Sequence, residues 1–355
     1  MKKIRLAVIG TGMAWNRLHL PAIQELKEEY EVVALADPNE TVLQNSANKI
    51  QMTSDNLYTD YKKMLMREDI DAVIVAVPID NNYLVSKDVL EAGKNLICEK
   101  PLAPNIKQGI EFINLQKEKN LKVLIAENYR YNEEHNLIKM FIEEKRIGDV
   151  LYFIKNNAFI FEEDMIQNTF GAKEWRQHPT FEGGIFLDGG VHDIAGLRYI
   201  FGDYDAVSAF GKPLDKDYSP YSVLSCNFMF KSGVTGQYTY CCTTKDDQKP
   251  PIGFRIIGTK GTIYLEDKYS GVISIYYDDG RHESHTFAPQ RGYYNEFKNF
   301  YNAFYNNEEI NVTPMVEFGD EKVIFAILNA AKEQRVIKVD STTQFITEYT
   351  STNRV

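Results

Sequence analysis

The segment Ile4-Arg5-Leu6-Ala7-Val8-Ile9-Gly10-Thr11-Gly12-Met13 decides the fold of this chain. Residues 6–9 form an apolar run of the length that a buried strand needs. The turn Gly10-Thr11-Gly12 follows at once, and we expect a helix to begin near Met13. A second apolar run, residues 32–36, ends on Asp37. Strand, glycine turn, helix and strand in this order indicate the first unit of a parallel α/β fold.

The same segment predicts a dinucleotide site. Glycines let the backbone approach a pyrophosphate, whose charge is stabilised by the N–H groups of the helix start. Asp37 can accept hydrogen bonds from the adenosine ribose. A glycine turn without a ligand is the alternative, but the spacing of the acidic residue favours a cofactor held by Gly10, Thr11, Gly12, Met13 and Asp37. Asp37 would repel a 2′-phosphate, and no basic residue closely follows it, so we expect NAD rather than NADP.

Two residues of the helix depart from the usual pattern. Trp15 occupies the position of the third fingerprint glycine, which normally allows close packing of helix and sheet. We therefore expect the helix either to stand off from the sheet or to turn the indole outward. Pro21 interrupts the helix interior and is expected to kink the helix or split it in two.

Length, composition and charge narrow the class of protein. A chain of 355 residues suits two domains, and 44% hydrophobic with 25% charged residues is typical of globular proteins. The net charge of −10 disfavours nucleic-acid and anionic-membrane partners. No apolar run is long enough to span a membrane, and Met1-Lys2-Lys3 leads directly into a strand rather than a signal peptide. We expect a cytoplasmic protein without metal, whose four cysteines lack metal or redox spacing and stay reduced.

Alternating strands and helices continue the first domain. Apolar strands are expected at residues 71–77, 96–98 and 123–126, with helices at 60–67, 82–92 and 106–119 between or beside them. This alternation predicts a Rossmann-type doubly wound parallel sheet in a domain of residues 1–126. Ligands bind beyond the carboxyl ends of such strands, where Val77, Pro78, Glu99 and Lys100 are placed.

The pattern changes near residue 127. Consecutive strand-like runs separated by turns predict an α+β domain, residues 127–340, with a large, mostly antiparallel open sheet. Leu224, Cys226, Phe228 and Phe230 share one face of a strand whose other face is also partly apolar. We expect a second copy of the chain to cover that open face, giving a homodimer or homotetramer. Residues 341–355 form a tail rich in Ser and Thr.

Asp188 and His192 are the candidate acid–base pair. They are four residues apart within a glycine-rich segment, so on a helix they share a face and the carboxylate can orient the imidazole. A solvated helix pair is the alternative reading of these two residues alone. Of the other histidines, we expect His19 to be structural and His135 to be solvated.

Several segments together resemble a known family. These segments are Gly10-Thr11-Gly12 with His19-Leu20-Pro21-Ala22, Glu99-Lys100-Pro101, Asn128-Tyr129-Arg130-Tyr131, Trp175-Arg176, and Gly183-Gly184 leading to Asp188 and His192. In order and spacing they resemble the Gfo/Idh/MocA oxidoreductases, which include glucose-fructose oxidoreductase and inositol dehydrogenase. Many members carry a histidine where this chain has Asn82-Tyr83.

The resemblance implies an NAD-dependent oxidoreductase acting on a secondary alcohol or ketone of a sugar, inositol or related polyol. It assigns Lys100, Asp188 and His192 to catalysis. From their positions, Asn128 and Arg130 are candidates for cofactor binding, and the candidate substrate ligands are Tyr131, Trp175, Arg176 and His178. Two alternatives remain: a cofactor-binding regulator without turnover, and an enzyme that reduces an imine or enol, or runs a redox-neutral cycle with tightly held NAD.

Overall fold

The computed structural model describes residues 2–339, which form two compact units. The first unit comprises residues up to Asn128 together with Gly292–Phe318, and the second comprises Tyr129–Arg291 with the described residues from Gly319 onward. Gly292–Phe318, which the sequence pattern placed in the second domain, thus groups with the first unit. The expected tail of residues 341–355 lies outside the described residues.

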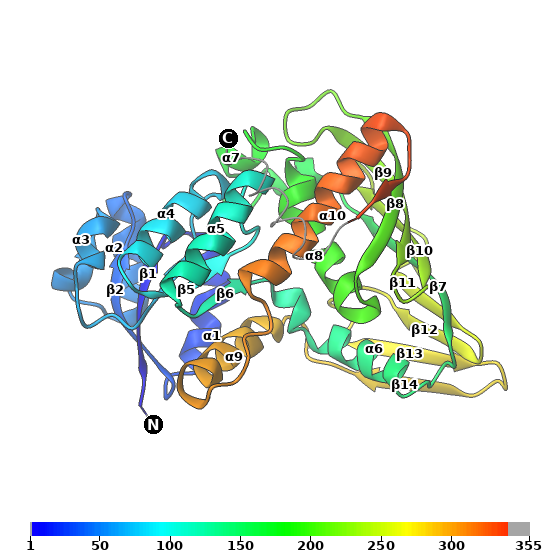
Figure 1. The fold of residues 1–355 in the computed structure, drawn as a ribbon, viewed down its shortest axis with the longest axis horizontal. Helices are drawn as coiled ribbons and strands as arrows, with labels where there is room; N and C mark the ends of the chain where they lie inside the picture. The colour runs from blue at the N-terminus through cyan, green and yellow to red at the C-terminus, as the bar shows by residue number, and fades with distance from the viewer. Residues whose placement is uncertain (1, 340–355) are drawn as a thin grey trace. The chain divides into compact units, whose positions relative to one another are not determined.

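A six-stranded parallel sheet forms the centre of the first unit (Figure 1). Its order is β3-β2-β1-β4-β5-β6, so the direction of winding reverses between β1 and β4. The strands are β1 Ile4–Ile9, β2 Tyr30–Ala36, β3 Leu57–Tyr58, β4 Ala72–Val75, β5 Asn95–Glu99 and β6 Val123–Ala126. β1 and β4 are buried almost throughout, as expected for strands covered on both faces. The predicted doubly wound Rossmann sheet is confirmed.

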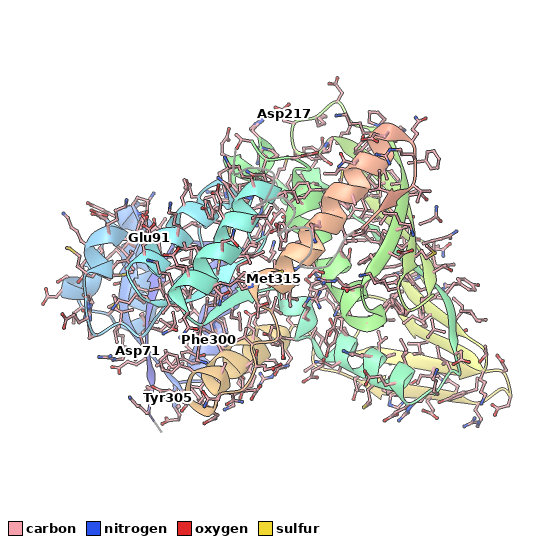
Figure 2. All side chains as sticks on the ribbon, in the orientation of Figure 1. Asp71, Glu91, Asp217, Phe300, Tyr305 and Met315 are labelled. Carbon is pink, nitrogen blue, oxygen red and sulfur yellow. The ribbon has the colours of Figure 1, made fainter. Side chains whose placement is uncertain are left out.

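Helices cover the two faces of this sheet. They are α1 Leu20–Glu25, α2 Glu40–Ile50, α3 Tyr61–Leu65, α4 Ile79–Glu91, α5 Ile106–Lys119 and α9 Gly292–Asn306. Side chains of Asn39 and Asn105 accept hydrogen bonds from N–H groups in the first turns of α2 and α5, which fixes where these helices begin. α9 joins this unit through its aromatic face, because Tyr30 donates its hydroxyl hydrogen to the Phe297 carbonyl at 2.6 Å. Figure 2 marks Phe300 and Tyr305 on the same helix.

Trp15 and Pro21 shape the helix after the glycine turn. Residues Trp15–His19 form a π-helical turn, and the indole is fully buried, donating to Ser46 Oγ at 2.9 Å. The outward-facing indole that we considered is therefore wrong: a polar partner inside the unit satisfies the indole N–H, so the ring can be buried. The split considered at Pro21 is wrong: helical residues run without a break from Met13 to Glu25, and the backbone before the proline is distorted into the π-helical turn instead.

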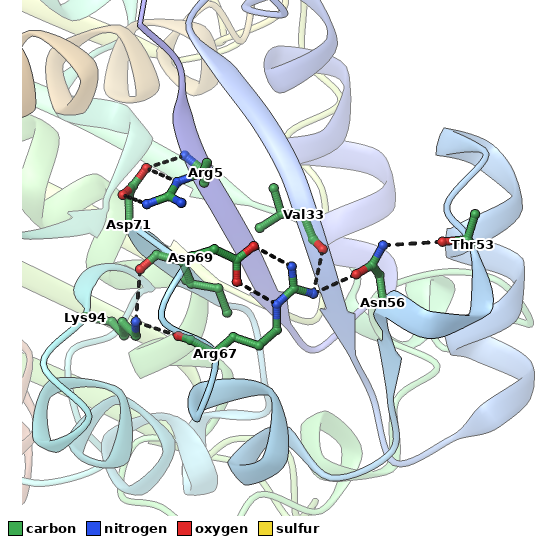
Figure 3. A network of polar contacts seen from close by, with 9 residues as sticks. Arg5, Val33, Thr53, Asn56, Arg67, Asp69, Asp71 and Lys94 are labelled. Atoms are coloured by element: carbon green, nitrogen blue, oxygen red, sulfur yellow. Dashed lines mark hydrogen bonds and ion pairs between the residues drawn. The ribbon is translucent and has the colours of Figure 1, made fainter.

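Polar contacts fix the amino-terminal edge of the first sheet (Figure 3). The Arg67 guanidinium donates to the Val33 carbonyl at 3.0 Å, to Asn56 at 2.7 Å and to both carboxylate oxygens of Asp69. Lys94 donates to the Arg67 carbonyl, and Arg5 pairs with Asp71 at 2.8 Å. These contacts tie loops before β4 and β5 to the sheet, at the edge opposite the carboxyl ends where a ligand would bind.

A nine-stranded sheet forms the centre of the second unit, in the order β14-β13-β12-β11-β7-β10-β9-β8-β15 (Figure 1). Its strands are β7 Val150–Ala158, β8 Tyr204–Pro213, β9 Tyr221–Phe230, β10 Thr235–Cys241, β11 Phe254–Gly258, β12 Gly261–Leu265, β13 Val272–Tyr277, β14 His282–Thr286 and β15 Ile337–Lys338. β7 and β10 pair in parallel, and the other described neighbours pair antiparallel. The mostly antiparallel sheet expected from the sequence is confirmed.

One face of this sheet is packed and the other is open. The alternate residues of β9 from Leu224 to Phe230 are buried as predicted, and Phe153 on β7 stacks on Phe201 with ring centroids 4.8 Å apart. Phe201 belongs to α8, and the helices of this unit are α6 Glu133–Glu143, α7 Glu174–Gln177, α8 Ile185–Phe201 and the greater part of α10 Pro314–Glu333. Large apolar side chains are exposed on the sheet, among them Phe210 at 64% and Met229 at 40%. The homo-oligomer remains a prediction.

Candidate active site

The glycine turn lies at the carboxyl end of β1. Gly10 has φ +87°, and a Cβ there would lie 2.3 Å from the carbonyl oxygen of Ala76, so only glycine fits between the turn and the residues after β4. Gly12 is different, because a Cβ at that position would meet no atom within 4 Å. The backbone at Gly12 therefore borders open space, as a pyrophosphate cradle requires.

Asp37 lies directly beside this turn. Its Oδ2 accepts hydrogen bonds from the Thr11 backbone N–H at 2.9 Å and from the Thr11 hydroxyl at 3.3 Å. Its Oδ1 accepts from the Asn39 N–H at 2.9 Å, which orients the carboxylate. The structure thus brings together the turn and the acidic residue that the sequence assigned to one cofactor, and these residues fit a dinucleotide with its ribose near Asp37.

The other expected cofactor residues of the first unit lie along the same edge of the sheet. Val77 and Pro78 follow β4, Glu99 ends β5 with Lys100 after it, and Asn128 follows β6. Met13 begins the helical residues after the turn. Because carboxyl ends of parallel strands meet at one edge, all of these residues are placed where doubly wound folds bind their ligands.

His19 and Asn82 hold the strand end that bears Lys100. His19 is buried, as expected of a structural histidine, and its Nε2 lies 2.6 Å from Glu99 Oε1. The Asn82 amide donates to the Glu99 carbonyl at 2.6 Å and to the Pro101 carbonyl at 2.9 Å. Sequence reasoning missed this role of Asn82. One feature of the sequence could have indicated it: Asn82 is a polar residue in the first turn of the helix that follows Pro78, where the preceding strand has ended.

Arg130 makes a buried ion pair in the second unit. Its guanidinium donates to both carboxylate oxygens of Asp320, with contacts of 2.7 to 3.1 Å. Asp320 is fully buried and also accepts from Arg198 at 3.2 Å. Two buried guanidinium groups thus share one carboxylate, a fixed arrangement that would be costly to break. Cofactor binding by Arg130 stays a prediction.

Asp188 lies in the first turn of α8 and is buried. Arg176 of α7 donates from Nε to Asp188 Oδ2 at 2.6 Å, and its guanidinium lies 4.4 Å from the ring centroid of Trp175. Two of the expected substrate ligands are therefore grouped with a candidate catalytic residue. His178 points elsewhere: its side chain is 56% exposed and its Nδ1 lies 2.8 Å from Asp217, on the loop between β8 and β9 (Figure 2).

His192, one turn further along α8, stacks on Tyr129. The two ring centroids are 4.7 Å apart with an interplanar angle of 18°. Lys268 donates from Nζ to the Tyr129 hydroxyl at 3.0 Å. His135 is also buried here and its Nδ1 lies 2.8 Å from the Tyr129 carbonyl, so the expectation that it is solvated is wrong. The sequence neighbours of His135 are polar, so the sequence gives no sign that the face of α6 bearing His135 packs against α8. Tyr131 is buried as well.

Glu134 is a fully buried carboxyl group near the same cluster. Burial raises the pKa of Glu134 to about 7, although Lys155 and Lys268 partly oppose this rise. The protonated carboxyl therefore favours folding below the unfolded pKa of 4.5, and this contribution is lost as the pH rises through about 7. In the wild type we expect this group to lower the free energy of unfolding by roughly 3 kcal/mol between pH 4.5 and 8. In Glu134→Gln, whose amide does not ionise, this part of the pH dependence should be absent.

Urea unfolding of the wild type and of Glu134→Gln at pH 5 and pH 8 measures this difference. Glu143→Gln is the matched control, because it neutralises an exposed carboxylate on the same helix and should keep the wild-type fall in stability at pH 8. Equal pH dependence of the unfolding midpoint in the wild type and in Glu134→Gln would contradict the assignment.

Neither a metal-ligand cluster nor a disulfide is present within residues 2–339. Within residues 2–339, no group of three or more His, Cys, Asp or Glu side chains is arranged to hold a metal ion. All four cysteines are buried and unpaired, and burial raises the pKa of Cys98 to about 12, which suits an inert structural thiol. No helix in the same range combines the length and apolar character needed to cross a membrane.

Comparison with known proteins agrees with this description. Residues 4–127 match the model of an oxidoreductase family with an NAD-binding Rossmann fold, and residues 135–264 match the Gfo/Idh/MocA C-terminal domain. An uncharacterised protein of Saccharomyces cerevisiae is 27% identical over 278 residues, 78% of each chain.

Solved structures share the complete fold. An oxidoreductase from Thermotoga maritima superposes with a TM-score of 0.84 at 27% identity, covering 95% of this chain and 99% of the other. A levoglucosan dehydrogenase in complex with NADH and levoglucosan has a TM-score of 0.83 at 20% identity, covering 95% and 100%. With both domain models matched in order along the chain, this protein belongs to the Gfo/Idh/MocA family of NAD-binding oxidoreductases.

Proposed function

We propose that this protein is an NAD-dependent dehydrogenase or reductase that transfers a hydride between the nicotinamide and a secondary alcohol or ketone of a sugar, inositol or related polyol. The observation on which the proposal rests most is the contact of Asp37 with Thr11 beside the open backbone of Gly12. A similar fold in a levoglucosan dehydrogenase, whose structure is solved in complex with NADH and levoglucosan, supports the substrate class.

The chain's own residues would bind and orient the substrate and move its proton. When bound, the nicotinamide cofactor supplies the hydride chemistry. His192 would take the hydroxyl proton, and Asp188 one turn away would stabilise the imidazolium that forms. Arg176 holds Asp188 through a 2.6 Å hydrogen bond and so orients its carboxylate. Lys100 would donate to the reacting oxygen and stabilise its developing charge.

Asp37 is proposed to select NAD over NADP. Its carboxylate is held by two backbone N–H groups beside the turn, where a 2′-phosphate would be repelled. We expect Asp37→Ser to weaken NADH binding about tenfold and to reduce the ratio of NADH affinity to NADPH affinity by a similar factor. Fluorescence titration of the reduced cofactors measures both affinities. Glu40→Ser, which removes an exposed charge from the first turn of α2, is the control.

A wild-type protein that binds NADPH more tightly than NADH would contradict the assignment of Asp37. Retention of the full NADH preference by Asp37→Ser would contradict it as well, because the carboxylate would then have no part in discrimination.

A further inference from the structure

A tyrosine and a lysine far apart in the chain converge on His192. Tyr129 follows β6 directly, and Lys268 lies in the turn between β12 and β13, 139 residues later. The Lys268 ammonium donates to the Tyr129 hydroxyl at 3.0 Å and lies 5.4 Å from the centroid of the Tyr129 ring. That ring in turn stacks on the His192 imidazole.

We propose that Tyr129 and Lys268 are positioning residues for His192, with Tyr129 fixing the plane of the imidazole and Lys268 fixing Tyr129. The inference rests on the proposed function in taking His192 as the base. It goes beyond that function, since it identifies what sets the orientation of the base.

The stack restricts rotation of the imidazole. With centroids 4.7 Å apart and planes 18° from parallel, the His192 ring cannot rotate about its χ2 axis without losing this contact. Tyr129 is itself held at both ends: its hydroxyl accepts from Lys268, and its carbonyl lies 2.8 Å from Nδ1 of the buried His135. A base fixed in this way needs no reorientation before it takes a proton.

Lys268 holds the far end of the Tyr129 ring. The phenol groups of Tyr129 and Tyr269 raise the pKa of Lys268, so the ammonium stays charged near neutral pH. A charged ammonium donates a stronger hydrogen bond to the Tyr129 hydroxyl than a neutral amine would.

Other ionisable groups surround the same cluster and contribute to its field. They are Asp188 and Asp193 on α8, Glu134 and His135 on α6, Lys155 on β7 and Arg176 on α7. Asp193 is paired with Lys155 at 3.1 Å and Asp188 with Arg176 at 2.6 Å, so each of these two carboxylates has a counter-ion of its own. Lys268 differs, because it donates a hydrogen bond to a hydroxyl, that of Tyr129.

Nuclear magnetic resonance of the His192 ring tests the proposal without requiring turnover. The chain has six histidines, and loss of a signal in His192→Gln identifies the resonance. Because a stacked aromatic ring shields the protons over its face, we expect Tyr129→Leu to move the His192 ring-proton signals downfield, whereas Tyr129→Phe should leave them near their wild-type positions. Lys268→Met should move them in the same direction by less, and Lys268→Arg should restore them.

Steady-state kinetics separate the two roles. We expect Lys268→Met to lower kcat by a smaller factor than Tyr129→Leu, and Lys268→Arg to restore it. Tyr129→Leu should lower kcat about tenfold or more with the KM for NAD unchanged, while Tyr129→Phe should stay within about threefold of the wild type. These variants leave Asp188 and Lys100 in place.

Equal His192 ring-proton shifts and equal kcat values in the wild type and Lys268→Met would overturn the proposed role of Lys268. Equal kcat values in Tyr129→Leu and Tyr129→Phe would overturn that of the stack. His192 signals that respond to Tyr129→Leu in a protein without hydride transfer would support the stack and overturn the proposed function instead, so the two failures are distinguishable.

Discussion

Replacing His192 by glutamine is expected to slow hydride transfer by about 10²- to 10⁴-fold, the usual contribution of a positioned general base. Glutamine can still donate and accept hydrogen bonds, but it cannot take up the alcohol proton at neutral pH. Binding of NADH should stay within about twofold, because the dinucleotide turn belongs to the first unit and His192 to the second. Stopped-flow absorbance of the reduced nicotinamide measures the hydride-transfer step.

His178→Gln is the matched control for this loss. His178 is more than half exposed and pairs with Asp217, so its removal should leave the hydride-transfer rate within about twofold.

Lys100→Met should lower the rate by about 10²- to 10³-fold through loss of charge stabilisation at the reacting oxygen. A His192→Gln protein with the wild-type rate would exclude this histidine as the base.

The second large effect is expected at the glycine turn, where two neighbouring glycines should respond in opposite ways. Gly10→Ala forces an alanine to φ +87° and its methyl group to 2.3 Å from the Ala76 carbonyl oxygen. Such backbone strain together with a clash should cost roughly 3 kcal/mol or more of unfolding free energy. Urea or thermal unfolding followed by circular dichroism measures this loss.

Gly12→Ala should leave stability nearly unchanged, because its methyl group would meet no atom within 4 Å. The methyl group would instead enter the space that a pyrophosphate needs, so we expect NADH affinity to fall by about tenfold or more. Isothermal titration calorimetry on the folded variant measures the affinity. A Gly12→Ala protein that binds NADH as tightly as the wild type would show that the cofactor does not approach this backbone.

The first sheet could be predicted closely from sequence because its strands are short apolar runs bounded by turns. Residues 123–126 and the helix 106–119 agree with β6 and α5 at both ends. The second sheet was harder. β14, His282–Thr286, is a polar edge strand without an apolar run, so nothing in its composition distinguishes it from a loop.

Long-range packing explains the remaining differences. Nothing in the local pattern of Gly292–Asn306 shows that its aromatic face packs against Tyr30, more than 260 residues earlier. Trp15 was expected to hold its helix away from the sheet or to turn its indole outward. The indole is buried instead, because the Ser46 hydroxyl accepts a hydrogen bond from its N–H group. Local reasoning identifies which residues are apolar or ionisable, and tertiary contacts decide which of them meet.

The candidate site shows the same division. The spacing of Asp188 and His192 places them on one helix face, but it was the family resemblance that assigned them to catalysis, and Asp37 was recognisable by its position after a strand. Arg176 was expected to contact substrate, which stays a prediction, and its pairing with Asp188 was not foreseen. The contact between Tyr129 and Lys268 joins residues 139 positions apart, so no sequence window contains both.

The central claim is that Lys100 and His192 serve hydride transfer between NAD and a polyol. A screen of polyols, sugars and sugar acids with NAD, following the absorbance of the reduced nicotinamide, tests it most directly. We predict that at least one secondary alcohol is oxidised and that this turnover is lost in both Lys100→Met and His192→Gln. Turnover that survives unchanged in both variants would contradict the claim.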